Sequence, residues 1–188
     1  LCAGISVIFC IMLHSFGKVF KTFSPNPYER VFFGGTVILC ITLLLGTTRY
    51  SGTGIEVIVS AIGGTARNTD FFWKMLFTAI TLACGYKGGE IIPSFFVGAT
   101  FGCVIAPVLG LSSSLGAAIG MVSVFCGVTN CPIASLLIAL ELFGKVPILY
   151  FLLAIAISYM LSGYYSLYKT QIIAVSKYKN EYVDKKTH

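Results

Sequence analysis

The sequence predicts an all-α, polytopic membrane protein built from tilted and broken helices. Of its 188 residues, 56% are hydrophobic and 11% are charged, whereas a soluble domain carries about 25% charged residues. The mean hydropathy is +0.89. Several apolar runs, interrupted by glycine, are shorter than the ~20 residues that cross a bilayer. Such runs indicate helices that are tilted or that end inside a bundle.

The breaks between apolar runs define the expected elements. A loop at Ser24–Pro27, a glycine-rich stretch at Gly46–Gly54 and a turn at Gly144-Lys145 separate them. The expected helices, in order, are Leu1–Phe23, Val31–Leu45, the short Ile55–Ile62, Phe71–Cys84, Ser94–Leu111, Leu115–Val128, Ile133–Phe143, Val146–Leu161 and a last one from Ser162 to Val175.

Charge is concentrated in the connections and at the C-terminus. The net charge of +6 forms no basic stripe interleaved with aromatic residues, so nucleic acid is not an expected partner. Lys18, Lys21 and Arg30 make the first loop basic, which places it on the cytoplasmic side. We expect a transmembrane region at 1–175 and a frayed, basic cytoplasmic tail at 176–188. Because Leu1 lies within an apolar run, we expect the sequence to be a fragment of a longer chain.

Few polar residues could carry chemistry. The seven cysteines are scattered through apolar segments without a CxxC pair, so we interpret them as packing residues and expect neither a metal site nor a disulfide. Two acidic residues, Glu56 and Asp70, flank short segments and are expected to be solvated.

The functional reading of the chain depends on the stretch from Cys84 to Pro93, which reads Cys-Gly-Tyr-Lys-Gly-Gly-Glu-Ile-Ile-Pro and is called the signature below. Its glycines lead the backbone into a helix with proline in the first turn, where a missing N–H costs nothing. The amides at a helix start have no intrahelical acceptor and lie at the positive end of the helix dipole, so they attract anions. An apolar run of membrane-spanning length follows directly. A helix that begins at membrane depth and faces an anion is typical of transporters and channels.

The run after the signature carries small residues at four-residue spacing: Gly98, Gly102 and Ala106. Small residues on one helix face allow two backbones to approach closely in lipid. We therefore expect this helix to pack tightly against a neighbour.

Three motifs resemble the CLC chloride channel and transporter family. Gly89-Glu90-Ile91-Ile92-Pro93, with Phe95, Phe96 and Gly98, is similar to the signature of that family's second half. Asn130 to Glu141 and Gly163 to Tyr168 resemble its later helices, in the same order and spacing. The resemblance covers essentially the whole chain and implies the second of two inverted repeats.

The resemblance implies site residues at matching positions. The central anion would be bound by backbone amides in the segment Gly89, Glu90, Ile91 and Ile92, chiefly those of Glu90 and Ile91, and by the hydroxyl of Tyr168. Phe96 would line the pore. The chain would need no cofactor beyond the transported anion, chloride or fluoride, and protons in the case of exchange.

Glu90 departs from the usual family pattern, which has an apolar residue there and phenylalanine in place of Ile91. A charge near the bilayer centre costs roughly 2.5–3.5 kcal/mol on insertion scales. Glu90 is either a carboxylate stabilised by the helix dipole or a proton carrier. A similar glutamate, and Phe96, occur in the fluoride-exporting branch, which has threonine where Ile92 stands. The preference between chloride and fluoride stays open.

Four functions are weighed. Anion/proton antiport leads, and a passive voltage-gated-type chloride channel is the alternative. A non-transporting helical subunit is more remote, as is a membrane-embedded enzyme using Glu90 and Glu141, because the sequence offers no nucleophile with a base. The resemblance also implies a homodimer formed through Ile133–Phe143 and Val146–Leu161, embedded in the lipid bilayer. We expect the plasma (inner) membrane of a bacterium.

Overall fold

The computed structural model describes residues 1–188 except 145–147, 169, 179–180 and 188. For residues 183–186 it describes the backbone and not the side chains. Its helices are α1 Cys2–Phe23, α2 Pro27–Leu45, α3 Ile55–Ile62, α4 Asp70–Ala83, α5 Ile91–Ile105, the 3₁₀ turn η1 Ala106–Leu109, α6 Ser113–Thr129, α7 Pro132–Phe143 and α8 Ile148–Leu161. The strands are β1 Ile172–Val175 and β2 Tyr182–Lys186. The all-α membrane fold expected from the sequence is confirmed, with a terminal β-hairpin that was not expected.

The helix boundaries follow local signals. Asn26 caps α2 by accepting a hydrogen bond from the Tyr28 amide at 3.2 Å, and Pro27 occupies the first turn. Gly46 ends α2 with φ +61°. Asn130 ends α6 with φ +58°, two residues before Pro132 starts α7. The breaks expected at Ser24–Pro27, after Leu45 and at Asn130-Cys131-Pro132 are therefore confirmed. The turn expected at Gly144-Lys145 lies partly outside the described residues.

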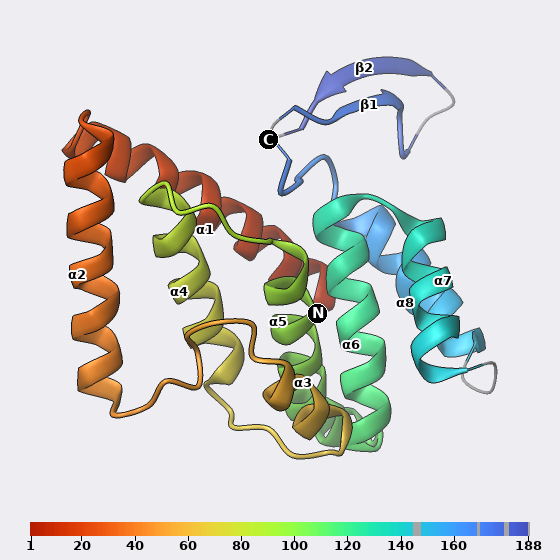
Figure 1. Ribbon diagram of the computed structural model, residues 1–188. Helices are drawn as coiled ribbons and strands as arrows, with labels where there is room; N and C mark the ends of the chain where they lie inside the picture. The colour runs from red at the N-terminus through yellow and green to blue at the C-terminus, as the bar shows by residue number, and fades with distance from the viewer. Residues whose placement is uncertain (145–147, 169, 179–180, 188) are drawn as a thin grey trace.

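The centre of the bundle is the pair α5 and α6, which run side by side (Figure 1) and contact each other more extensively than any other pair of described elements. Every residue of α6 from Gly120 to Thr129 is buried. In contrast, Gly34 is the one fully buried residue of α2. Ile38, Ile41 and Leu45 of that helix pack partly against the core, whereas Leu39, Leu43 and Leu44 are exposed.

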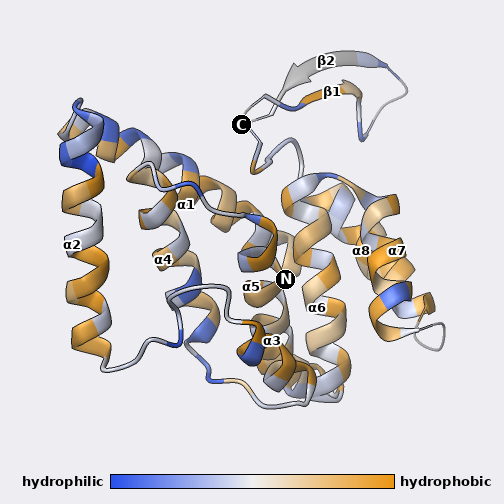
Figure 2. Cartoon of the chain, in the orientation of Figure 1, coloured by the Kyte–Doolittle hydropathy of each residue, from blue (hydrophilic) through white to orange (hydrophobic). Residues whose placement is uncertain are grey.

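The described part of the chain contains three helices that are long and apolar enough to cross a membrane: α1, α2 and the continuous segment Ile91–Leu109. The helices α6, α7 and α8 are shorter and also apolar. Hydrophobic residues extend along most of the helices, and hydrophilic residues gather at the α1–α2 connection (Figure 2). The chain is a multi-pass membrane segment.

The C-terminal end differs from the expectation. No helix follows α8 in the described residues between Ser162 and Val175; instead β1 pairs antiparallel with β2, with Val175 opposite Tyr182. The expected last helix and the frayed tail are both wrong, and the hairpin crosses the boundary expected at 175/176. The residues of β1, Ile-Ile-Ala-Val, include three β-branched side chains, which favour a strand.

Candidate anion site at the start of α5

The glycine-rich signature connects α4 to α5 without regular structure. Gly85 has φ +97°, a left-handed conformation that side chains rarely adopt, and it turns the chain just after Cys84 ends α4. Helix α5 begins at Ile91, and its first helical hydrogen bond runs from the Ser94 amide to the Glu90 carbonyl at 3.2 Å. Pro93 therefore lies in the first turn, as the sequence predicted.

The amides at this helix start are open. Among the described residues, no hydrogen-bond acceptor is found for the backbone N–H groups of Glu90, Ile91 and Ile92, and no side chain caps the helix. Ile91 is 42% exposed and Ile92 is 36% exposed, so the protein does not cover this end. The helix start thus presents donors and the positive end of a dipole to whatever occupies the space before it.

Glu90 is half-buried and is the residue that directly precedes α5. Its carboxyl lies close enough to Cys10 of α1 to interact with it electrostatically. Glu90 is not among the residues that line the neighbouring cavity.

A cavity of about 460 Å³ adjoins the signature loop. Gly88, Gly89 and Ile92 form one side of it, and α4 contributes Lys74 to another. Sequence reasoning gave Lys74 no role, although a single lysine within the apolar helix Asp70–Ala83 is itself a signal.

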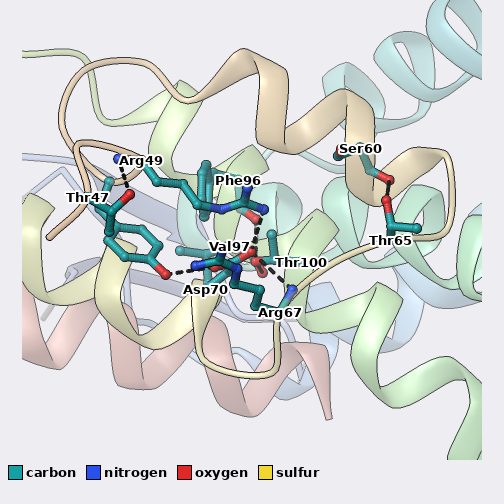
Figure 3. Close-up of polar contacts among 10 residues, drawn as sticks. Thr47, Arg49, Ser60, Thr65, Arg67, Asp70, Phe96, Val97 and Thr100 are labelled. Atoms are coloured by element: carbon teal, nitrogen blue, oxygen red, sulfur yellow. Dashed lines mark hydrogen bonds and ion pairs between the residues drawn. The ribbon is translucent and has the colours of Figure 1, made fainter. Parts of the chain in front are cut away.

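One turn before Lys74 on α4 lies a buried carboxylate, Asp70, which is 0% exposed. It accepts hydrogen bonds from Arg49 Nη2 at 2.9 Å, the Tyr50 hydroxyl at 2.8 Å and the Arg67 amide at 3.2 Å. Figure 3 shows these contacts converging on Asp70. The expectation that Asp70 is solvated is wrong, because Arg49 and Tyr50, far away in the sequence, enclose it. Glu56, by contrast, is exposed as expected.

Comparison with known proteins identifies the family. The model of the family described as voltage gated chloride channel matches residues 1–163. The chain belongs to this family. The chloride/fluoride channel protein of Pseudomonas syringae pv. tomato is 36% identical over 92% of this chain and 39% of its own length. An uncharacterized protein of Methanocaldococcus jannaschii is 22% identical over 74% of this chain and 38% of its own length.

A solved structure shows the same fold. The crystal structure of a CLC-type fluoride/proton antiporter matches with a TM-score of 0.86 and 31% identity, over 89% of this chain and 42% of that one. The chain thus spans about two fifths of the length of these relatives. Membership in a family of channels and transporters argues against the membrane-embedded enzyme. Among the described residues, no cluster of potential metal ligands is found.

Two further predicted site residues of this voltage gated chloride channel family member, Phe96 and Tyr168, make no described hydrogen bond to the open amides of Glu90, Ile91 and Ile92. Phe96 is 0% exposed, in the core under Lys74. Tyr168 is 43% exposed, and its carbonyl accepts hydrogen bonds from Gln171 and Thr187 at the base of the hairpin. No described contact joins either residue to Glu90, so the pore role of Phe96 and the anion role of Tyr168 stay predictions.

Proposed function

We propose that the complete protein moves small anions, chloride or fluoride, across a membrane, and that the amides before and within the first turn of α5 bind the anion. The observation that carries this proposal is the open helix start: the Glu90, Ile91 and Ile92 amides have no described acceptor. The names of the relatives support it, one being a chloride/fluoride channel protein and the other a fluoride/proton antiporter.

We propose further that transport is coupled to protons and that Glu90 carries them. The support is a half-buried carboxyl within electrostatic range of Cys10 on α1 that does not line the cavity next to the signature loop. The alternative is a passive channel in which Glu90 only interacts with the helix dipole.

Proton coupling is tested with the full-length protein in liposomes. An imposed anion gradient should drive protons uphill in the wild type, and Glu90→Gln should abolish that movement. Glu56→Gln, which changes an exposed carboxylate on α3, is the matched control and should pump like the wild type. Sustained anion flux without uphill proton movement in the wild type would leave the channel as the mechanism.

The role of Tyr168 is tested by anion binding to the purified protein. Tyr168→Phe should weaken binding measured by calorimetry, because one hydroxyl donor is lost, while folding is retained. Tyr182→Phe is the control, since Tyr182 is 90% exposed on β2. Equal affinity in both variants would remove Tyr168 from the site.

We also propose a homodimer formed through α7 and α8, in the inner membrane of a bacterium. These helices leave large apolar side chains exposed, among them Leu137 at 60% and Leu153 at 64%. Replacing both leucines by tryptophan should yield monomers, as measured by light scattering. The control is Leu44→Trp on α2, where Leu44 is 86% exposed, and this variant should remain a dimer. A dimer in both cases would place the interface elsewhere.

A further inference from the structure

Lys177 is a buried cation in the connection between β1 and β2. It is 9% exposed, and its ammonium donates to the Asn130 side-chain carbonyl, to the Tyr159 carbonyl at 2.9 Å and to the Ser162 hydroxyl at 3.2 Å. The Tyr159 ring centroid lies 4.2 Å from Nζ, a distance at which a cation is attracted to an aromatic face. Because an ammonium has three protons, these three acceptors satisfy it, and all of them lie at or next to the ends of α6 and α8. Lys177 therefore holds the hairpin against these two helix ends.

The segment between α8 and β1 is bonded to the last turn of α6. The Leu167 amide donates to the Val128 carbonyl at 2.9 Å, and the Gln171 side chain donates to the Thr129 carbonyl at 3.0 Å. The last four carbonyls of a helix have no partner within it, so these bonds complete the end of α6. Tyr168 lies between the two anchoring residues, and the position of its backbone therefore depends on how firmly this segment is docked.

The hairpin also holds the Tyr168 backbone. The Tyr168 carbonyl accepts a hydrogen bond from the Thr187 hydroxyl at 2.8 Å, and the Thr187 amide donates to the Gln171 carbonyl at 3.1 Å. Thr187 directly follows β2, whereas Lys177 precedes that strand. The chain on either side of β2 is thus fixed, at Thr187 to the Tyr168 segment and at Lys177 to the helices. Loss of the Lys177 contacts would loosen the strand that leads to Thr187, and with it the support of Tyr168.

The residue before Tyr168 belongs to the packing around α5. Leu167 is 6% exposed and lies in one buried cluster with Cys10 of α1 and Val97 of α5. Cys10 in turn is within electrostatic range of Glu90, which directly precedes α5. The segment that carries Tyr168 is thus part of the same packing as the helix whose start is the proposed anion site.

We propose that Lys177 is a positioning residue for anion binding: it locks the hairpin onto the ends of α6 and α8, and the docked hairpin places the Tyr168 hydroxyl on the anion. Lys177 itself does not touch the anion, because its three protons are donated to protein acceptors. A displacement of the hydroxyl by about 1 Å is enough to lose most of a hydrogen bond. The inference rests on the proposed function, in which Tyr168 binds the anion, and adds a residue outside the site that controls its geometry.

The first test is a double-mutant cycle on the purified full-length protein, with chloride and fluoride as probes in calorimetry. Lys177→Met keeps the length of the side chain but removes the ammonium, and it should weaken binding roughly fivefold, the worth of about one hydrogen bond. Tyr168→Phe should weaken binding by a similar factor. The double variant should bind no more weakly than Tyr168→Phe, because both changes act through one hydroxyl. Lys21→Met, which removes an exposed cation at the end of α1, should bind like the wild type.

The cycle separates the inference from the proposed function. Losses that add up in the double variant, or wild-type affinity in folded Lys177→Met, overturn the inference and leave the role of Tyr168 intact. Wild-type affinity in Tyr168→Phe overturns the role of Tyr168 in the proposed function, and the inference falls with it.

The second test needs no variant. Coupling between two sites is reciprocal, so if the docked hairpin favours anion binding, the bound anion must favour docking. Saturating anion should slow amide exchange several-fold at Leu167 and Thr187 of the wild type and leave it unchanged at Gly46, whose amide donates to Leu43 at the end of α2. Slower exchange supports the inference even if Lys177→Met does not fold. Equal exchange at both residues, in protein that binds the anion, overturns it.

Discussion

The contact between α5 and α6 depends on the absence of side chains at Gly98. A Cβ added there would lie 2.5 Å from the Gly120 carbonyl oxygen and 2.8 Å from Met121 Cα, whereas an ordinary van der Waals contact begins at 3.4 Å. The two helices would have to separate by about 0.9 Å, the difference between 3.4 and 2.5 Å. The obstacle is backbone on both sides, so no side chain can move away instead.

The cost of Gly98→Ala follows from two opposing effects. Overpacking of a well-packed interior costs about 1–3 kcal/mol, and a clash between backbones belongs at the upper end. Alanine is a better helix former than glycine by about 1 kcal/mol. We therefore expect Gly98→Ala to lower the free energy of unfolding by about 2 kcal/mol, from these two values.

The measurement is the fraction of monodisperse full-length protein that remains in detergent after heating. Gly4→Ala is the matched control, because Gly4 also lies inside a helix and a Cβ there meets nothing within 4 Å. Gly4→Ala should be neutral or stabilising, while Gly98→Ala should aggregate at a lower temperature. Equal melting of the two variants would refute the reasoning about the interface.

Two further predictions concern buried polar groups. Asp70→Ala should lower the free energy of unfolding by about 2–4 kcal/mol. This loss is smaller than for a fully buried ion pair because Arg49 is partly exposed. Tyr50→Phe should lower it by about 1 kcal/mol, and equal thermal unfolding of both variants and the wild type would contradict these values. Burial lowers the pKa of Lys177, ordinarily 10.5, to about 8. Because the unfolded state then binds more protons between pH 8 and 10.5, docking of the hairpin should strengthen as pH rises through that window. Amide-exchange protection of β1, corrected for intrinsic rates, should increase from pH 7.5 to 9.5 in the wild type and stay flat in Lys177→Met; protection that falls with pH would show the opposite linkage.

The sequence predicted those features that neighbouring residues determine. Glycine, proline and asparagine mark the ends of helices through their own backbone preferences, and so the start of α5 near Pro93 and the break after Asn130 were both found. The four-residue spacing that includes Gly98 and Gly102 likewise predicted a close helix contact, which the α5–α6 pair confirms.

Prediction from the sequence was wrong for charged residues whose hydrogen-bond partners are distant along the chain. Lys177 falls in the tail that was expected to be frayed, but it is buried and donates to Asn130, to the Tyr159 carbonyl at 2.9 Å and to Ser162 at 3.2 Å. The same reason explains Asp70, because two of its partners, Arg49 and Tyr50, lie 21 and 20 residues earlier. A lysine or aspartate near the end of an apolar segment has the same local pattern whether or not the fold later encloses it.

The glycine contact and the proposed anion site lie on the same helix, α5, so a change that affects stability should also affect binding. Gly98 lies two turns after the open amides of Ile91 and Ile92, on the same helix. A displacement of α5 by about 0.9 Å at Gly98 would carry those amides with it, and a hydrogen bond to an anion weakens when its donor moves by such a distance. Gly98→Ala should therefore weaken anion binding even at temperatures where the protein stays folded, whereas Gly4→Ala should not. If the binding affinity of folded Gly98→Ala equals that of the wild type, the helix start is positioned by the signature loop rather than by α6.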